Sequence, residues 1–512
     1  MNSQCPNSEP VVLMKNIVKV YPDGTIALQG VDFELCRGEI HGLLGENGAG
    51  KSTLMKILAG LIKPTRGEVV VRGRPVKFHS PADALKQGIG IVMQGLSLVP
   101  VFTAYENIIL GARRVKPSRE EIEKLMQETG LIVPLDTPVE NLSFGVRQKI
   151  EILKMLALNV DILILDEPTT NLSPTETRDL FKTLLKLKEQ GKSIVLITHK
   201  IREIYEATDR VTVLRKGRLI GTVETSKVTP RDLAKMMVGR EVELSINKPP
   251  SKPGETALKV EDLEVLGDLG VPAVRGVSFE VRYGEIFGIA GVEGNGQIEL
   301  AEAIVGMRKP VRGRIILDNE EITVLDTSER YKRGIAYVPE DRKTSLIMEF
   351  SLVENTPLTE ITYSREIVGK MGFIRMKQLI EKTTKIVREY NVITPSIYTS
   401  ARALSGGNQQ RFIVGRELSK DPKVIIVAQP TRGLDVAATE YVRNLLVEMR
   451  SKGKAVILIS SDLDEVLSLS DRLAVMYNGR FMGIVDPSRI TDEELGLMMG
   501  GYTYEEIKAQ RV

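Results

Sequence analysis

Short apolar runs alternate with amphipathic stretches along both halves of the chain. The runs occupy residues 38–44, 162–165 and 194–197 in the first half and 284–290, 424–427 and 455–459 in the second. Short runs with little polar alternation are typical of strands that are buried on both faces of a parallel sheet. The stretches between them have helical periodicity. The pattern therefore predicts an α/β fold with mostly parallel sheets covered by helices.

The two halves repeat one another. Gly38–Ile40 matches Gly284–Ile286 at an offset of 246 residues, and Leu142–Ser143 matches Leu404–Ser405 at an offset of 262 residues. A repeat this long indicates a duplicated domain rather than a solenoid unit. The longer offset places extra residues of the second half before its Leu-Ser motif, in a region rich in helix formers. We therefore expect an inserted helical subdomain that tolerates changes of length.

The repeat also sets the predicted domain boundaries. A chain of 512 residues is too long for one hydrophobic core. We expect a first domain over residues 11–240 and a second over residues 257–505. Residues 241–256 contain three prolines and a glycine, which prevent a helix, so this stretch is predicted to be a short, semi-stiff linker.

A glycine-rich loop follows the first apolar strand and matches the G-x-x-x-x-G-K-[ST] pattern of phosphate-binding loops. Its glycines let backbone N–H groups face phosphates, and the next helix adds its positive N-terminal end. The lysine meets the β- and γ-phosphates, and the serine hydroxyl binds Mg²⁺. We therefore expect nucleotide contacts along the whole loop, which consists of Gly45, Glu46, Asn47, Gly48, Ala49, Gly50, Lys51, Ser52 and Thr53.

Further candidate residues follow the apolar runs. Asp166 and Glu167 end the strand at 162–165, where Asp166 would hold magnesium, directly or through water, and Glu167 would act on the attacking water. His199 ends the next strand and is expected to contact the γ-phosphate. Tyr21, before the first strand pair, is expected to stack on adenine. The structural alternatives are an acidic turn and a packed histidine.

The second half keeps the glycines of the loop but lacks its reactive groups. Gln297, Ile298 and Glu299 replace Lys51, Ser52 and Thr53; Ala428 and Gln429 replace Asp166 and Glu167; Ser461 replaces His199, Gly267 replaces Tyr21, and Glu340 replaces Gln94. These changes remove the lysine charge, the magnesium ligands and the aromatic ring together, and they add carboxylates that would repel a triphosphate. We therefore predict that the second pocket is inactive.

A second anion-binding motif is intact only in the second half. Ser405, Gly406 and Gly407 open a helix in the second half, and they are predicted to bind phosphate at its N-terminal end. In the first half, bulky Phe144 stands where close backbone approach needs a glycine. The first half thus carries the complete phosphate loop and the second half the complete Ser-Gly-Gly motif. A Ser-Gly-Gly sequence is common in loops, so the indication comes from this complementary distribution of the two motifs.

Composition narrows the classes of function. Lys and Arg (70) nearly balance Asp and Glu (67) and are interspersed with them, so the net charge of +3 gives no electrostatic footprint for nucleic acid. The two cysteines support neither a disulfide framework nor a zinc site and suit a reducing cytosol. We expect no signal peptide, and no apolar stretch approaches the ~20 residues that span a bilayer. Any membrane role is therefore expected to be peripheral.

At this point the chain resembles the ATP-binding cassette (ABC) family over residues 11 to 502. Residues 45–53 are similar to its Walker A motif, Asp166 and Glu167 to its Walker B motif, and His199 to its switch histidine. Leu142 and Leu404 are similar to the starts of its two signature motifs. Gln94 is similar to its Q-loop glutamine, and the resemblance implies that this residue serves both catalysis and the metal. The resemblance implies ATP and Mg²⁺ as cofactors, an antiparallel β part, and an inserted helical subdomain in each of two P-loop domains.

The family's arrangement implies one complete site. Its cassettes pair head to tail, with each ATP between the Walker A of one and the signature of the other. Here an intramolecular pair of this kind would join the Walker residues of the first half to Ser405, Gly406 and Gly407 of the second. One departure from the family's pattern is Ser173, which stands in the first half where the second half has Asp435, similar to the D-loop aspartate.

Fused cassettes of this length resemble the ATPase subunits of ribose-type sugar importers. The sequences at 290–297, 337–342 and 427–435 look more like the nucleoside-uptake branch. The resemblance implies two transmembrane permease subunits, a solute-binding lipoprotein beyond them, and a peripheral position on the cytoplasmic face of the cell membrane. The alternatives are simple-sugar import, a tandem cassette acting on ribosomes or DNA, and a nucleotide sensor without turnover.

Overall fold

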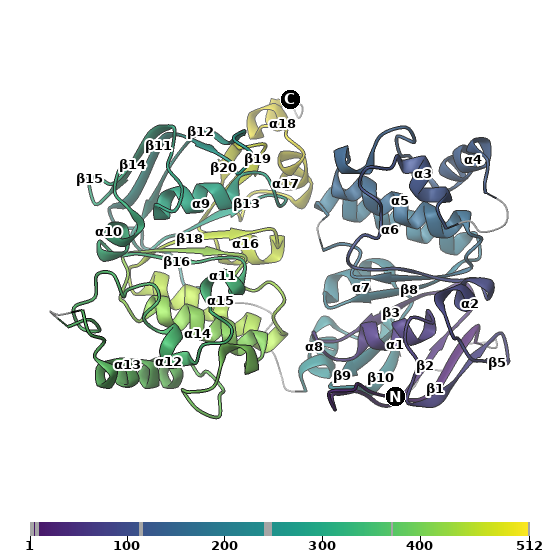
Figure 1. The fold of residues 1–512 in the computed structure, drawn as a ribbon. Helices are drawn as coiled ribbons and strands as arrows, with labels where there is room; N and C mark the ends of the chain where they lie inside the picture. Colours follow the sequence, from purple (N-terminus) through teal and green to yellow (C-terminus); the bar gives the residue numbers. More distant parts are fainter. Residues whose placement is uncertain are drawn as a thin grey trace. The chain divides into compact units, whose positions relative to one another are not determined.

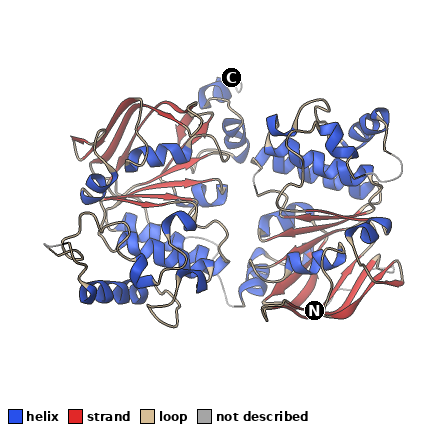
Figure 2. Cartoon of the chain, in the orientation of Figure 1, coloured by secondary structure: helices blue, strands red, loops and turns tan. Residues whose placement is uncertain are grey.

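The computed structural model describes residues 5, 10–111, 116–170, 172–239, 248–369 and 372–509. The chain divides into two compact units, residues 1–244 and 245–512 (Figure 1). Each unit contains one six-stranded and one four-stranded sheet, with helices packed on both (Figure 2). The predicted α/β fold with two tandem domains is confirmed.

The six-stranded sheet of the first unit has the order β10-β9-β3-β8-β7-β6. Its strands are β3 (Ile40–Leu44), β6 (Ile89–Val92), β7 (Ile162–Asp166), β8 (Ser193–Thr198), β9 (Arg210–Arg215) and β10 (Arg218–Glu224). All neighbouring pairs are parallel except β9 with β10. Every residue of β3, β7 and β8 is buried, which explains why these strands are continuous apolar runs.

The four-stranded sheet of this unit is antiparallel, with the order β2-β1-β4-β5. Its strands are β1 (Val12–Val20), β2 (Ile26–Leu35), β4 (Arg66–Val71) and β5 (Arg74–Val76). Helix α1 (Lys51–Leu58) packs Leu54, Met55 and Leu58 into a core that includes residues of both sheets. The phosphate loop, which leads from β3 into α1, is therefore held by the main core of the unit.

A second core covers the other face of the parallel sheet with helices. The helices of the first unit are α2 (Pro81–Lys86), α3 (Ala104–Ile109), α4 (Arg119–Thr129), α5 (Phe144–Ala157), α6 (Pro174–Glu189), α7 (Ile201–Ala207) and α8 (Pro230–Val238), with 3₁₀ turns at Val139–Asn141 and Thr225–Lys227. Residues of α3, α4, α5 and α6 share one cluster with β6, β7 and β8. Helices α3 and α4 lie in the interval where the sequence predicts an inserted helical subdomain, and α5 packs against them from beyond the Leu-Ser motif.

The second unit repeats this topology, with sheet orders β16-β17-β18-β13-β19-β20 and β12-β11-β14-β15. Its strands are β11 (Thr256–Leu266), β12 (Pro272–Arg282), β13 (Ile286–Ala290), β14 (Arg312–Leu317), β15 (Glu320–Glu321), β16 (Ile335–Val338), β17 (Val424–Ala428), β18 (Ala455–Ser460), β19 (Arg472–Tyr477) and β20 (Arg480–Val485). The extra residues lie mainly between α12 and α13, where residues 356–375 correspond to residues 110–118 between α3 and α4.

The helices of the second unit complete the repeat. They are α9 (Gln297–Val305), α10 (Thr327–Lys332), α11 (Arg342–Ser345), α12 (Leu352–Asn355), α13 (Met376–Glu389), α14 (Gly406–Leu418), α15 (Val436–Ser451), α16 (Leu463–Leu469), α17 (Asp492–Met499) and α18 (Tyr504–Ala509), with a 3₁₀ turn at Ala401–Ala403. Of the predicted linker, residues 241–247 lie outside the described residues. From Lys248 the chain packs on the second unit, because Lys248 Nζ donates to Ser470 O at 2.6 Å.

One buried asparagine holds the loop before the helical subdomain in each unit. Asn107 and Asn355 are fully buried. Asn107 accepts a hydrogen bond from Val99 N, and the two hydrogens of its Nδ2 are shared among the carbonyls of Val99, Phe102 and Thr103. Asn355 makes the same set with Ile347, Phe350 and Ser351. Satisfying a buried amide so fully fixes the conformation of these surface loops.

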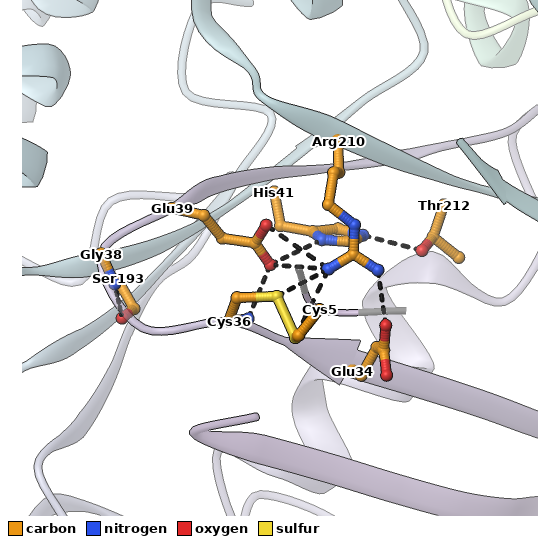
Figure 3. Close-up of a disulfide and its surroundings, with 9 residues drawn as sticks. All are labelled: Cys5, Glu34, Cys36, Gly38, Glu39, His41, Ser193, Arg210 and Thr212. Carbon is orange, nitrogen blue, oxygen red and sulfur yellow. Dashed lines mark hydrogen bonds and ion pairs between the residues drawn. A yellow bond between two sulfur atoms is a disulfide. The ribbon is translucent and has the colours of Figure 1, made fainter. Parts of the chain in front are cut away.

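A disulfide joins Cys5 to Cys36, so our expectation that the two cysteines form no disulfide is wrong. The pairing is long-range: the cysteines are 31 residues apart and their Cα atoms lie 5.7 Å apart. Cys36 follows β2 beside Arg210, whose Nη1 donates to Cys36 Sγ at 2.8 Å (Figure 3). Two carboxylates, Glu34 and Glu39, pair with this nearly buried guanidinium. The spacing of two cysteines carries no signal of such a contact.

Reduction of this disulfide is expected to destabilise the first unit. A cross-link that closes a loop of this length constrains the unfolded chain by about 3–4 kcal/mol, which corresponds to roughly 10 °C in the unfolding midpoint. Scanning calorimetry with and without reductant measures the shift. The Cys36→Ser variant should already unfold at the lower midpoint and should not respond to reductant. An unchanged midpoint for the parent protein would contradict the expectation.

Candidate nucleotide site

The phosphate loop of the first unit turns through glycines from β3 into α1. Gly48 and Gly50 adopt left-handed φ values of 79° and 101°. At Gly50 a Cβ atom would lie 2.7 Å from Ala27 O, and at Gly45 it would overlap Leu214 O. A side chain is therefore disfavoured by backbone conformation at Gly48, by close packing at Gly45, and by both at Gly50. The sequence pattern and the local structure agree on a tight backbone turn at the start of α1.

Lys51, the first residue of α1, folds back over the loop. Its Nζ donates to Gly45 O at 2.7 Å and to Glu46 O at 3.1 Å, and the residue is only 5% exposed. Burial lowers the pKa of Lys51, although the nearby carboxylates of Glu167 and Asp166 act in the opposite direction. The ammonium group is thus desolvated and aimed into the turn, where a phosphate group would provide its counter-charge.

Two oxygen ligands predicted for magnesium lie together at the start of α1 and the end of β7. Ser52 Oγ donates to Asp166 Oδ1 at 3.2 Å. Burial raises the pKa of Asp166, and the neighbouring Glu167 adds to this, while the hydrogen bond from Ser52 opposes it. Among the described residues no group of three or more His, Cys, Asp and Glu side chains could hold a metal ion. Hydroxyl and carboxylate oxygens are ligand types that Mg²⁺ accepts, so the chemistry of this pair fits the predicted metal.

Glu167, Gln94 and His199 form the predicted catalytic group. His199 Nδ1 lies 3.1 Å from Glu167 Oε1, and Gln94 Nε2 donates to Glu167 Oε2 at 3.2 Å. Burial raises the pKa of Glu167, but the hydrogen bond and charge of His199 and the charge of Lys51 lower it, and the net pKa is below the usual value. The carboxylate is therefore ionised near neutral pH and held between an imidazole and an amide.

The parallel sheet explains why these residues meet. Glu167 follows β7 and His199 follows β8, and these neighbouring strands are parallel, so both residues leave the same edge of the sheet. Glu167 has a φ of 48°, an unfavourable left-handed conformation for a glutamate. Its N–H donates to Ile197 O at 3.0 Å, which fixes the turn. Backbone geometry thus directs the carboxylate toward Gln94 and His199.

Tyr21 lies at the edge of the phosphate loop. Its hydroxyl is 3.3 Å from Thr53 Oγ1, and Lys19 Nζ lies 5.4 Å from the centroid of its ring. The structure therefore places the ring beside α1, next to the residues that would hold phosphates. Stacking of this ring on adenine remains a prediction.

In the second unit, the residues at the corresponding positions form hydrogen bonds within the unit. Gln297, at the position of Lys51, donates to Val292 O at 3.1 Å. Gln429, at the position of Glu167, accepts from Ser461 N at 3.2 Å and from Ser461 Oγ at 3.3 Å. These neutral pairs replace the Lys51 charge and the contact between Glu167 and His199.

An arginine that the sequence reasoning missed bridges two carboxylates in the second unit. Arg432 Nη1 lies 2.7 Å from Glu293 Oε1, in the glycine-rich loop, and also pairs with Glu340. Glu340, which is expected to repel a triphosphate, shares Arg432 with Glu293. The only sequence signal was the position of Arg432 inside the motif at 431–435, since its partners are distant along the chain.

The two signature serines cap helices in the same way. Ser405 Oγ accepts from Asn408 N at the start of α14, and Ser143 Oγ accepts from Val146 N at the start of α5, both at 3.4 Å. Both serines are exposed. Asp435 and Ser173, the two D-loop positions, are likewise N-caps, of α15 and α6. The structure thus assigns all four residues at least a structural role.

The fold and this site define a P-loop nucleotide-binding protein with two units, of which the first holds the reactive groups. The family model described as "ABC transporter" matches residues 28–170 and 274–432. The chain belongs to the ABC transporter family, whose members bind ATP. Both matched segments contain the glycine-rich loop of their unit.

Similar proteins cover nearly the whole chain. The nucleoside import ATP-binding protein NupA of Lactococcus lactis subsp. cremoris is 43% identical over 98% of this chain and 100% of its own length. The guanosine import ATP-binding protein NupO of Bacillus subtilis is 44% identical, covering 97% of this chain and 99% of its own length. The ribose import ATP-binding protein RbsA of Caldanaerobacter subterraneus is 38% identical, with 96% and 99% covered.

This chain also resembles a chain of a solved structure, with a TM-score of 0.62. That structure is the complex of an archaeal ribosomal stalk protein with the archaeal ribosome recycling factor aABCE1. The match covers 92% of this chain and 90% of that chain at 19% identity. At this identity the likeness shows the fold alone. Within the residues that the structure describes, no helix has the length and apolar character needed to cross a membrane.

Proposed function

We propose that the chain hydrolyses ATP to energise an importer, with nucleosides as the transported class. The convergence of Lys51, Ser52, Asp166, Glu167 and His199 at one end of the first unit carries the proposal of hydrolysis. Full-length similarity to nucleoside and guanosine import proteins supports the transported class. Import of simple sugars is the second candidate, supported by the similarity to the ribose import protein.

Magnesium fits the oxygen pair of the first unit. Ser52 and Asp166 would hold the metal ion. Gln94, the third residue predicted to contact the metal, donates to Glu167 at the same edge of the sheet. When bound, Mg²⁺ neutralises charge on the β- and γ-phosphate oxygens. Ile298 and Ala428 provide no such oxygens in the second unit, so we place the metal in the first unit only.

Hydrolysis then follows from the placement of Glu167. A water oxygen attacks the γ-phosphorus, the bond from that phosphorus to the β–γ bridging oxygen breaks, and its electron pair leaves with ADP. Glu167, ionised because His199 and Lys51 lower its pKa, accepts the water proton. Lys51 stabilises the phosphate charge, and His199 and Gln94 orient the carboxylate.

We place the γ-phosphate between the two units. Ser405 and the backbone of Gly406 and Gly407 in the second unit would cap the phosphate that Lys51 holds in the first. This pairing uses the complete motif of each unit. The alternative pairing would join Phe144 of the first unit to Gln297 and Gln429 of the second, which offer neither the lysine charge nor the carboxylate. One productive ATP site per chain follows.

Exposed apolar residues favour permease contacts in both units. Val101 and Phe102 are 67% and 38% exposed, and Ile347 and Phe350 are 40% and 39% exposed. They lie on the loops that Asn107 and Asn355 hold, between Gln94 or Glu340 and the helical subdomain. Exposed apolar groups on a fixed loop are suited to pack against another protein. We propose two membrane-embedded permease subunits as partners, a solute-binding lipoprotein beyond them, and the cytoplasmic face of the membrane as the location.

Co-expression with the permeases tests this function. We expect the chain to sediment with membranes only when the permeases are present, and gentle solubilisation should recover them with it. Val101→Asp combined with Ile347→Asp should reduce membrane association at least tenfold, while ATP binding persists. Val324→Asp, at a 93% exposed position on another surface loop, serves as the control. Recovery of ribosomal or DNA-repair proteins, or tight binding to protein-free anionic vesicles, would contradict the proposal.

A further inference from the structure

A buried glutamate joins the two segments that carry the catalytic group of the first unit. Glu203, in α7, is only 5% exposed. Its Oε2 accepts a hydrogen bond from Thr198 Oγ1 at 2.6 Å, and its Oε1 accepts one from Thr169 Oγ1. Thr198 is the residue before His199, and Thr169 lies two residues after Glu167. One carboxylate therefore ties the turn after β7 to the end of β8.

The same bridge fixes the backbone around His199. Thr198 Oγ1 accepts a hydrogen bond from Lys200 N at 3.0 Å, in addition to its bond to the glutamate. Lys200 Nζ lies 3.5 Å from Glu203 Oε1 and balances part of the charge of the buried carboxylate. Hydrogen bonds to a carboxylate are roughly twice as strong as those between neutral groups. The segment from Thr198 to Glu203, which contains His199, is therefore closed into a tight loop by its own hydrogen bonds.

The second unit carries only half of this bridge. Glu465 stands at the matching position of α16 and is fully buried, and its Oε1 accepts a hydrogen bond from Thr431 Oγ1 at 2.8 Å. Its Oε2 has no hydrogen-bond partner among the described residues. The hydroxyl of Ser460, the last residue of β18, donates to Gln429 Oε1 at 3.5 Å. The complete bridge thus occurs in the unit that has a carboxylate and an imidazole to align.

We propose that Glu203 is a positioning residue that sets the contact between the Glu167 carboxylate and the His199 imidazole. These two groups lie 3.1 Å apart, and each belongs to a segment that Glu203 holds. The role rests on the proposed action of Glu167 on the attacking water, because Glu203 acts only through these two side chains. A displacement of about 1 Å near a reacting group can lower the rate about 100-fold. Loss of the bridge should therefore slow hydrolysis while nucleotide binding by Lys51 and Ser52 persists.

Steady-state hydrolysis by the purified full-length Glu203→Ala variant tests the proposal. We expect kcat to fall roughly 10–100-fold while KM for Mg-ATP changes less than about threefold. Glu465→Ala is the matched control, because it removes the corresponding buried carboxylate from the second unit. This control should keep most of the activity. Equal losses of kcat in the two variants would show that both glutamates only support the fold, and would refute the proposal.

Milder variants keep the test decisive if the alanine variants fold poorly. Glu203→Gln should retain most of kcat, because its amide can accept one hydrogen bond and donate another, and a threonine hydroxyl serves in either direction. Thr169→Val removes one hydroxyl at nearly constant size, and kcat should fall roughly 3–30-fold. Thr431→Val is its control in the second unit. If Thr169→Val hydrolyses ATP as fast as Thr431→Val, the bridge has no positioning role.

The Glu167→Gln variant separates failure of this inference from failure of the proposed function. If Glu203 acts through Glu167, adding Glu203→Ala to Glu167→Gln should lower kcat by a further factor of no more than about two. A full additional loss would refute the inference. If Glu167→Gln lowers kcat and Glu203→Ala does not, the role of Glu203 is refuted while the action of Glu167 stands. If Glu167→Gln keeps full activity, the proposed action of Glu167 fails, and the role of Glu203 fails with it.

Discussion

Ser405→Arg is expected to lower ATP hydrolysis by roughly 10²–10³-fold, nearly as far as Lys51→Ala, although Ser405 and Lys51 belong to different units. The reason is that the arginine side chain blocks the donors that would cap the γ-phosphate, where charge is redistributed during phosphoryl transfer. Release of phosphate by the purified chain at saturating Mg-ATP measures the effect. No single-unit site accounts for such a loss.

Ser143→Arg is the matched control, because both serines are exposed and both accept a 3.4 Å hydrogen bond as helix N-caps. Each substitution removes a cap, which costs about 1 kcal/mol of stability. Ser143→Arg should nevertheless keep most of the activity, since in the proposed pairing it would face only the second pocket. Circular dichroism checks that both variants are folded. A folded Ser143→Arg variant without activity, beside an active Ser405→Arg variant, would refute the head-to-tail pairing.

Glu167→Gln is expected to bind one Mg-ATP per chain while hydrolysis falls roughly 10²–10⁴-fold. The amide keeps the size of the side chain but cannot accept the water proton. The second unit should add no magnesium-dependent site, because Ile298 and Ala428 provide no metal ligands. Titration calorimetry gives the number of sites. Two comparable magnesium-dependent sites would show that the second pocket is functional.

Gln297→Lys alone should not create a second hydrolytic site, and it serves as the companion to the Glu167→Gln experiment. The new lysine would stand in a pocket where Gln429 and Ser461 bond to each other and Arg432 bridges Glu293 and Glu340. It would restore one charge without the metal ligands or the general base. Activity of the Gln297→Lys, Glu167→Gln double variant above that of Glu167→Gln would contradict this expectation.

Local sequence patterns predict the fold well, and they also locate the candidate site residues of the first unit. The phosphate loop is a contiguous motif, so its glycines and Lys51 could be located without knowing the rest of the structure. Glu167 and His199 could be placed because residues that follow neighbouring parallel strands share one edge of the sheet. Apolar runs identified β3, β7 and β8 because these strands are buried along their whole length.

Contacts between distant segments could not be predicted in this way. The bridge from Arg432 to Glu293 and Glu340 joins three segments, and the approach of Glu176 to Gly145 depends on how α5 and α6 pack. The disulfide depends on Cys5 lying close to Cys36, which follows β2. Each of these contacts involves common residue types without a characteristic spacing. The sequence therefore indicated which groups the second pocket lacks, but not which contacts fill it.

The left-handed turn after β7 has a counterpart in the second unit, where Gln429 has a φ of 47° and its N–H donates to Ile459 O at 2.7 Å. The costly conformation persists in a pocket that has lost its carboxylate. It is therefore a property of the duplicated scaffold and not of catalysis. The second unit thus keeps the backbone shape of this strand end while its sequence carries neither of the two carboxylates that the first unit has there.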